Sequence, residues 1–557
     1  MANEMISNYT LEESNRKLPP NATVLGQAPP DEPVRISIYL RRRPDGPPLP
    51  GPDHWAKTAP LKRTYLTHEE FAQRHGALQA DIDLVLAFAA AHALTVVESS
   101  ISRRVVVLTG SVTQANAAFG IGLHYYQLGD KKYRGREGKL KIPERLAPAV
   151  ECVLGLDNRP LRRSPHPRTF TPPQVVAGAV PFPRIPLTPV QMAKLYSFPA
   201  ADASSQTIGI MEFDGGFAID PTTNRPTDVD PFFTALQLPP PVIATVLVGN
   251  ATNTLKGSAA SPSDSDLEVT ADIDVAAAVA PGSKIVVYFA PETTDAFVTA
   301  FDQAIHDTQN NPSVLTCSWN APEEDWSPDN FKKLQDILQE ANSFGITILV
   351  CSMDDGTNCG FNDGKAHVEY PATDANVISC GGTRIAAVNG ANFAEVTWND
   401  GQSGYVTGGG ISGLVDLPAW QANANLPPNI NDGVTRKRGI PDVAGNASGN
   451  SGYTIQLYGQ PFTIAGTSFV APLYAGLIAL INASLGKRVG NINSWLYQIA
   501  ETPGQAVFRD IKDGGNNGVL FGTGSSPKYI AGAGWDACTG WGSIVGSALL
   551  EQLQRLG

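Results

Sequence analysis

Short apolar runs alternate with stretches of helical pattern through the last two thirds of the chain. Each run is bounded by turn residues and is almost free of charge, as expected for a strand that is buried on both faces of a parallel sheet. The runs are Thr207–Phe213, Lys284–Ala290, Ser313–Trp319, Gly345–Cys351 and Val377–Cys380. Strands that alternate with helices predict an α/β domain with a doubly wound, mostly parallel sheet.

The first third of the chain has a different pattern. Residues 34–40 alternate as in an amphipathic strand, residues 68–76 and 80–93 have helical spacing, and a strand at 105–110 precedes a helix at 111–119 that Ser111 can cap. This order predicts a small α+β domain of two βαβ-like halves. A stretch rich in Pro and Arg follows, residues 159–186, and we expect it to be a linker that proteases can cut.

A candidate nucleophile stands at Gly466-Thr467-Ser468, between a predicted strand at 461–465 and a helix that begins at Ala471. A serine in such a turn presents its hydroxyl at a helix N-terminus. The Gly-Thr-Ser-x-x-x-Pro pattern is similar to that of subtilisin-like serine peptidases, which use a histidine base. Only His306 and His367 lie beyond residue 170, and neither has the sequence context of that base. Either the site is inactive or another base replaces histidine.

Two carboxylates supply an alternative base. Glu268 and Asp272 are four residues apart and share one face if the segment is helical. Such a pair is often a solvated acidic face, but the apolar continuation to Ala280 favours a buried helix. Neighbouring buried carboxylates share a proton, so one pKa rises and the other falls. In acid, Glu268 can then accept the proton of Ser468, with Asp272 orienting it.

Asp354 is a third candidate acid, because it follows the buried strand predicted at 345–351. Functional side chains gather at the carboxyl ends of parallel strands. The alternative is an ordinary turn, since Asp354-Asp355-Gly356 is also good turn chemistry.

Together these motifs resemble the sedolisin (serine-carboxyl peptidase) family, in particular its kumamolisin-like members. The resemblance covers nearly the whole chain and rests on Glu268-x-x-x-Asp272, Ser318-Trp319-Asn320, Asp354, Pro441-Asp442-Val443-Ala444-Gly445-Asn446, Gly466-Thr467-Ser468 and Gly534-Trp535-Asp536. It implies a subtilisin-like peptidase domain at 188–557 and a cleavable linker at 166–187. It also implies a ferredoxin-like prodomain at 1–165, which inhibits the peptidase and aids its folding. It also implies that Ser468 is the nucleophile, Glu268 the general base, Asp272 its orienting acid and Asp354 the oxyanion stabiliser.

The resemblance extends to residues around these four. Glu212 and Trp319 would lengthen the hydrogen-bond network behind Glu268, although a strand-end acid and a packed indole explain them equally well. The backbone of Ser318, Trp319 and Asn320 would pair with substrate, and Glu369 would line a subsite for a basic or polar side chain. One structural Ca²⁺ would be held by the residues Asp510, Ile511, Gly532, Gly534 and Asp536, through two carboxylates and three carbonyls.

Composition and charge are consistent with this interpretation. The chain has 557 residues, 42% of them hydrophobic, enough for two domains. Residues 1–168 carry 23 Lys+Arg and 17 Asp+Glu (net +6), and the remainder 18 and 36 (net −18), which together give −12. Complementary charge suggests that the two parts dock and separate in acid, as carboxylates protonate. The six cysteines lack metal-site spacing, and we expect ordinary thiols.

We expect a monomer that acts on polypeptides and binds neither nucleic acid nor membrane, because no nucleic-acid motif or membrane-spanning apolar run is evident. The expected compartment is extracellular or acidic, although no standard signal peptide is visible. The favoured function is an acid-active serine endopeptidase made as a self-activating zymogen. Two alternatives are a tripeptidyl-peptidase-type exopeptidase and a non-catalytic binding protein on the same fold.

Overall fold

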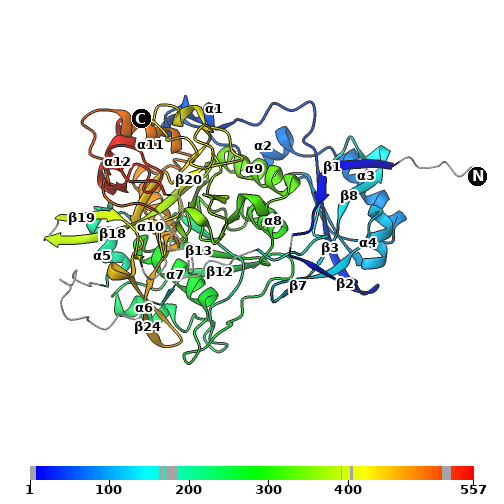
Figure 1. Ribbon diagram of the computed structural model, residues 1–557, viewed down its shortest axis with the longest axis horizontal. Coiled ribbons are helices and arrows are strands. Elements are labelled where there is room, and N and C mark those ends of the chain that lie inside the picture. Colours follow the sequence, from blue (N-terminus) through cyan, green and yellow to red (C-terminus); the bar gives the residue numbers. More distant parts are fainter. Residues whose placement is uncertain are drawn as a thin grey trace, which may run out of the picture.

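The computed structural model describes residues 8–19, 21–161, 168–169, 186–389, 392–401, 405–516 and 528–556. The chain forms two domains that lie side by side, with the N-terminal domain, blue to cyan, at one end of the molecule (Figure 1). A segment of the N-terminal domain that includes α1 reaches back along the larger domain as far as α11.

The larger domain is built on one eight-stranded sheet. Its strand order is β12-β13-β11-β14-β16-β18-β19, with β22 pairing β18, and all pairs are parallel except β18 with β19. The strands are β11 (Thr207–Glu212), β12 (Val242–Leu247), β13 (Lys284–Phe289), β14 (Val314–Cys317), β16 (Thr347–Cys351), β18 (Ile378–Asn389), β19 (Asn392–Thr397) and β22 (Val443–Asn446). The predicted parallel sheet is confirmed. The edge strand β12 was missed, because it is largely exposed and so lacks the surroundings of a central strand.

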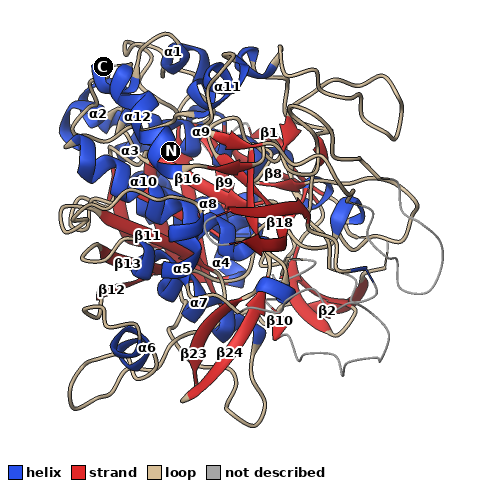
Figure 2. Ribbon diagram, turned by 90° about the vertical axis from the view of Figure 1, so that its left-hand side faces the viewer, coloured by secondary structure: helices blue, strands red, loops and turns tan. Residues whose placement is uncertain are grey.

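Helices cover both faces of this sheet (Figure 2). On one face, α7 (Asp264–Val279) packs against α10 (Val470–Leu485), and on the other α8 (Thr294–Ile305) packs against α9 (Pro328–Ser343). Gly476 permits the close α7–α10 contact, since an added Cβ would lie 2.5 Å from Cγ1 of Val279. The other α-helices among the described residues of this domain are α5 (Pro189–Leu195), α6 (Val229–Ala235), α11 (Asn493–Glu501) and α12 (Gly546–Arg555).

The helix α10 and the turn before it, Thr467–Leu485, are long and apolar enough to cross a membrane by length and composition. The sequence interpretation found no such run. In the structure 83% of the most apolar 18-residue stretch of this segment is buried inside the domain, so core packing accounts for its apolar character.

The N-terminal domain has the predicted ferredoxin-like topology. Its antiparallel sheet has the order β4-β5-β3-β9, formed by β3 (Pro33–Leu40), β4 (Thr95–Ser100), β5 (Val105–Ser111) and β9 (Val150–Leu154). The helices are α2 (His68–His75), α3 (Gln79–Ala91) and α4 (Val112–Phe119), and Ser111 caps α4 as predicted by accepting from the N–H of Gln114. Two further sheets were not predicted: β1 (Asn8–Arg16) with β8 (Gly138–Pro143), and β2 (Thr23–Gln27), β6 (His124–Leu128) and β7 (Lys131–Gly135).

An arm of the N-terminal domain, residues 49–67, lies along the larger domain and contains α1 (Pro52–Ala56). Its Arg63 is 1% exposed and donates to the main-chain oxygens of Val489 (2.8 Å) and Asn491 (2.5 Å). The hydroxyl of Tyr65 donates to the same Val489 oxygen at 2.9 Å. The arm therefore fastens the two domains together at a second place, which sequence pattern did not reveal.

Most of the predicted linker, 166–187, lies outside the described residues. Its described part includes β10 (Arg168–Thr169), which pairs antiparallel with β24 (Gln460–Ala465) in the register Arg168↔Ala465. The linker backbone thus runs beside the strand that leads into Ser468.

Candidate active site

Ser468 lies in a single helical turn between β24 and α10, and its side chain is 1% exposed. Gly466 begins this turn with φ 149°, and an added Cβ there would lie 2.8 Å from Oδ2 of Asp354. A side chain at Gly466 would therefore collide with the acid next to Ser468. The sharp turn into α10 is the one the motif predicts.

Glu268 and Asp272 are both on α7 and both fully buried, which confirms the predicted buried helix. The hydroxyl of Ser318 donates to Asp272, 2.8 Å from Oδ2 and 3.1 Å from Oδ1. Neither oxygen of Glu268 has a hydrogen-bond partner of good geometry among the described residues. The Ser468 and Ser318 hydroxyls are nevertheless close enough to lower its pKa.

Burial is the main cause of the unusual acidity in this cluster. It raises the pKa of Glu268 well above its ordinary value, and repulsion from Asp272 raises it further. Burial and then Glu212 raise the pKa of Asp272, while the Ser318 hydroxyl opposes them. Carboxyls in this arrangement hold protons at pH values where exposed acids have lost them.

Glu212 and Trp319 lie behind this pair. Glu212 ends β11 and is fully buried, and Nε1 of Trp319 donates to its Oε2 at 2.9 Å. Burial, then the charge of Glu268, raises the pKa of Glu212. The acid and the indole therefore form one hydrogen-bonded unit next to Glu268, rather than two unrelated packing residues.

Asp354 follows β16 and contacts the turn that carries the nucleophile. Both the main-chain N–H and the hydroxyl of Thr467 donate to its Oδ1, at 2.8 and 2.7 Å. The preceding residue, Met353, has φ 72°, a left-handed conformation that favours glycine. Glu212, Ser318 and Asp354 follow or end the adjacent strands β11, β14 and β16, so the parallel sheet brings them to one edge.

The predicted substrate-binding residues surround this edge and are all buried. Asn320 donates through Nδ2 to the Cys351 oxygen at 2.9 Å and accepts from the N–H of Ala372 at 3.0 Å. Glu369 is 3% exposed and lies opposite Pro322 in the short pairing of β17 (Glu369–Tyr370) with β15 (Ala321–Pro322). The side chain of Asn320 therefore holds the strand ends together.

The two histidines of the larger domain have other partners. Nε2 of His306 is 2.7 Å from Glu340, and Nδ1 of His367 is 2.6 Å from Glu324. All six cysteines are free and buried, as expected. Among the described residues, the acids Glu268 and Asp354, rather than these histidines, lie beside Ser468 and its turn.

The sequence interpretation missed two contributions. The hydroxyl of Ser318 bonds Asp272, whereas only its backbone was assigned a role, and Thr467 bonds Asp354. Both residues stand inside the motifs, but a motif does not reveal where a hydroxyl points.

Four of the five predicted calcium-binding residues, Asp510, Gly532, Gly534 and Asp536, meet at a glycine turn. The N–H of Gly534 donates to Asp510 (3.2 Å) and that of Gly532 to Asp536 (3.1 Å), so both carboxylates face one turn. Asp536 otherwise accepts from Thr539 and Cys538, and burial raises its pKa to about 6. Among the described residues no three His, Cys, Asp or Glu side chains cluster as a metal site. An ion would therefore need main-chain oxygens, and the donor set of two carboxylates and carbonyls suits Ca²⁺.

Comparisons with known proteins show the family of this chain. Residues 20–159 match the pro-kumamolisin activation domain, and residues 243–525 match the subtilase family. Kumamolisin of Bacillus sp. (strain MN-32) is 39% identical over 97% of this chain and 95% of its own length. Tripeptidyl-peptidase sed5 of Aspergillus fumigatus is 28% identical over 98% of both chains. The solved structure of Pseudomonas sedolisin, a serine-carboxyl proteinase in complex with pseudo-iodotyrostatin, matches with a TM-score of 0.57 at 27% identity, over 67% of this chain and 99% of its own.

Proposed function

The chain belongs to the subtilase family, as a sedolisin-type serine peptidase with a pro-kumamolisin activation domain, and we propose that it is the self-activating zymogen of an acid-active endopeptidase. One observation carries the proposal: Ser468 lies at the N-terminus of α10, next to the buried carboxyl of Glu268, and the neighbouring Thr467 donates to the half-buried carboxyl of Asp354.

In the proposed reaction the Glu268–Asp272 pair holds one proton, which lies on Asp272, so that Glu268 is ionised. Oγ of Ser468 bonds to the carbonyl carbon of the peptide while its proton passes to Glu268. The carbonyl oxygen becomes an oxyanion, and protonated Asp354 donates a hydrogen bond to it. Glu268 then gives its proton to the leaving nitrogen as the C–N bond breaks, and water repeats the sequence to release the acyl group. Asp272, held by Ser318, orients Glu268 and shares its proton.

Substrate would lie along the strand ends that carry Ser318, Trp319 and Asn320, adding a strand by main-chain hydrogen bonds. Glu369, a nearly buried acid beside them, would attract a basic side chain of the substrate. The pairing of linker residues Arg168 and Thr169 with β24 supports a linker that is presented to the site before cleavage.

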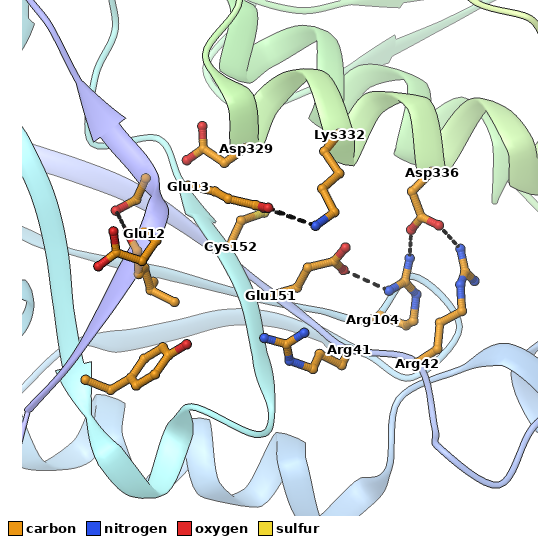
Figure 3. Close-up of a pocket in the computed structure, with 13 residues that line it drawn as sticks. Glu12, Glu13, Arg41, Arg42, Arg104, Glu151, Cys152, Asp329, Lys332 and Asp336 are labelled. Carbon is orange, nitrogen blue, oxygen red and sulfur yellow. Dashed lines mark hydrogen bonds and ion pairs between the residues drawn. The ribbon is translucent and has the colours of Figure 1, made fainter. Parts of the chain in front are cut away.

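The prosegment is held by ion pairs across the domain interface. Arg42 and Arg104 of the N-terminal domain both bind Asp336 of α9, and Glu13 of β1 binds Lys332 (Figure 3). Arg16 pairs with Asp329 at 2.6 Å. This interface supports an intramolecular inhibitor at residues 1–165 that separates after cleavage within 159–186, with 188–557 as the peptidase domain of the active enzyme.

We also propose one Ca²⁺, held by the Asp510 and Asp536 carboxylates and the carbonyls of Ile511, Gly532 and Gly534. The ion would offset the buried charge of Asp536 and stabilise the turn, which packs on the main chain of Pro441 through Trp535 Nε1 (3.1 Å). It would take no part in bond cleavage.

The names of some relatives favour a second candidate, a tripeptidyl-peptidase that removes three residues at a time. Endopeptidase activity is preferred because identity to kumamolisin, 39%, exceeds the 28% to tripeptidyl-peptidase sed5. The test is to incubate the protein with an unfolded substrate from pH 3 to 7 and size the products. Large internal fragments, and cleavage of N-acetylated peptides, would support the endopeptidase, whereas tripeptides alone would support the alternative.

A further inference from the structure

We propose that His367 is a positioning residue: its imidazolium ion holds residues 359–369 against η3 (Glu323–Asp325) in acid and releases them as the pH rises. This segment starts five residues after Asp354 and ends at Glu369, so it joins the proposed oxyanion acid to the proposed subsite acid. The inference therefore rests on the proposed function of Glu369.

Both ring nitrogens of His367 face carboxylates. Nδ1 lies 2.6 Å from Oε1 of Glu324 on η3, and Nε2 lies 3.1 Å from Oδ1 of Asp363. Oδ1 of Asp363 also accepts from the main-chain N–H of Lys365 at 3.0 Å. A neutral imidazole carries one N–H and can donate to only one of two ionised carboxylates. The arrangement therefore fits the imidazolium ion, which donates to both and closes a clamp between η3 and the segment.

Packing fixes the ring in this position. It stacks on Phe361, with the ring centroids 4.1 Å apart and the planes 19° apart, and the side chain of His367 is 6% exposed. The main-chain N–H of His367 donates to the oxygen of Thr357 at 2.6 Å. Because Glu324 and Asp363 are 51% and 43% exposed, the clamp is weak enough to open when the ring loses its charge.

The residues that follow the ring lie beside the proposed substrate strand. The oxygen of Val368 accepts from the main-chain N–H of Glu323 at 3.1 Å, and Glu369 lies opposite Pro322 in the pairing of β17 with β15. The strand β15 begins directly after residues 318–320, along which we propose that substrate binds. The clamp therefore holds Glu369 next to the backbone that receives the substrate.

The clamp is charged over an acid range of pH. Burial lowers the pKa of His367, but the hydrogen bonds and charges of Glu324 and Asp363 outweigh burial and raise it above 6.5. Burial raises the pKa of Asp363, but His367 and Lys365 outweigh burial and lower it. The stabilisation from His367 is therefore complete below about pH 6.5 and is lost as the pH rises through its raised pKa. In strong acid it is lost once the pH falls through the lowered pKa of Asp363.

A second contact holds the same segment without a titratable group. The main-chain N–H of Ala366 donates to Oδ1 of Asn431 at 2.8 Å, and Nδ2 of Asn431 donates to the oxygen of Ala366 at 2.7 Å. An Asn431→Ala variant should loosen the segment by the same factor at every pH. It is therefore the matched control for His367.

The first test is limited digestion of the full-length Ser468→Ala chain by a lysine-specific endopeptidase from about pH 6 to 9. Lys365 is exposed, and a free peptide of residues 361–369 in the same tube corrects for the pH dependence of the digesting enzyme. Relative to this peptide, cleavage after Lys365 should become roughly 10-fold faster between pH 6 and 9. His367→Gln should be cut at the faster rate throughout, whereas Asn431→Ala should be cut faster but keep the rise.

Kinetics of the activated enzyme connect the clamp to substrate binding. Near pH 5, His367→Gln should raise KM roughly 3- to 10-fold for a peptide that places lysine in the Glu369 subsite, with kcat nearly unchanged. The same peptide with glutamine in place of that lysine should lose less. A residue with only a packing role would not separate these two peptides.

Cleavage after Lys365 that does not change with pH, or that is equal in His367→Gln and the parent chain, would overturn the proposal. An unchanged KM for the lysine peptide would overturn the positioning role even if the digestion behaves as expected. If His367→Gln does not fold, Glu324→Gln, at a half-exposed residue, should speed the digestion at pH 6, and no change would refute the clamp. The digestion needs no catalysis by this chain, so an inactive wild type would refute the proposed function alone.

Discussion

The hydroxyl of Ser318 donates to the carboxyl of Asp272 at 2.8 Å and lies 3.0 Å from the main-chain oxygen of Ser468. One side chain at the end of β14 thus contacts both the acid on α7 and the turn of the nucleophile before α10. The contact therefore holds α7, which carries Glu268 and Asp272, in a fixed position relative to the turn of Ser468 before α10.

Removing the nucleophile or the base should abolish peptidase activity without unfolding the chain. Ser468→Ala loses only a hydroxyl, and Glu268→Gln keeps the shape of the base. We expect kcat to fall by at least roughly 10³-fold in each. The measurement is hydrolysis of a peptide in acid, with circular dichroism to verify folding. Asp274→Asn, on the same buried helix but outside the site, is the matched control and should stay active. A Glu268→Gln enzyme with most of its activity would show that the base is elsewhere.

Asp274 should make the peptidase domain less stable as the pH rises. It is fully buried without a hydrogen-bond partner of good geometry among the described residues, and burial raises its pKa well above the ordinary value. The folded state therefore keeps a proton on Asp274 that the unfolded state releases above about pH 4. Because of this difference, the free energy of unfolding is highest in acid and falls towards neutral pH.

Replacing the acid should remove the contribution of Asp274 to this decline. In a Ser468→Ala background, Asp274→Asn should gain roughly 1–3 kcal/mol at pH 7 and little at pH 4. Thermal unfolding at the two pH values tests this. If the substitution changed the free energy of unfolding equally at pH 4 and pH 7, Asp274 would not be the titrating group.

Acid should trigger cleavage between Arg159 and Pro186, and the Ser468→Ala variant should stay intact. Gel electrophoresis over a pH series detects the cleavage, and N-terminal sequencing of the larger fragment locates it. A wild-type chain that remains whole in acid, or a variant cut at the wild-type rate, would refute the self-activating zymogen.

Two carboxylates at the interface, Asp336 and Glu340, are poor acid sensors. The arginines Arg104 and Arg42 lower the pKa of Asp336 and of Glu340, so these acids stay charged near pH 4. His68, the first residue of α2, is better suited. Its ring stacks on Phe344 of the larger domain at 4.2 Å, and burial, then His306, lowers its pKa to about 4.

Docking keeps His68 neutral, so its contribution to docking is complete above pH 6.5 and is lost as the pH falls towards 4. The neighbouring charges are Arg488, which disfavours the imidazolium, and Asp307, which favours it less strongly. A His68→Phe variant keeps the stacking but cannot protonate. Its activation midpoint should move down by roughly 0.5 pH unit. His124→Gln, whose ring contacts Gly122 and Tyr126 of its own domain, should activate as wild type does. An unchanged midpoint in His68→Phe would exclude this histidine as the sensor.

Calcium should stabilise the peptidase domain, because a ligand bound only by the folded state opposes unfolding. At 100 times its Kd the gain is about 2.7 kcal/mol. Melting curves of Ser468→Ala with excess Ca²⁺ or with a chelator, at equal ionic strength, measure it. Asp536→Asn should remove most of the difference. Identical midpoints with and without the chelator would argue against a calcium site.

The sequence alone determined the parallel sheet, the ferredoxin-like domain and the positions of the catalytic candidates. Each depends on a local regularity: apolar runs of strand length, a four-residue spacing on α7, and a serine between a strand and a helix. The tertiary structure decided what those regularities could not. The buried Arg63 donates to main-chain oxygens of residues more than 400 positions later in the chain. In the N-terminal domain, β1 pairs with β8, which lies more than 100 residues later. Likewise, Ser318 and Thr467 stand in recognisable motifs, but the direction of each hydroxyl depends on packing between strands and helices distant in sequence. Burial then sets the chemistry, because desolvation raises the pKa of Glu268, Asp272 and Glu212 only once the fold has brought them together.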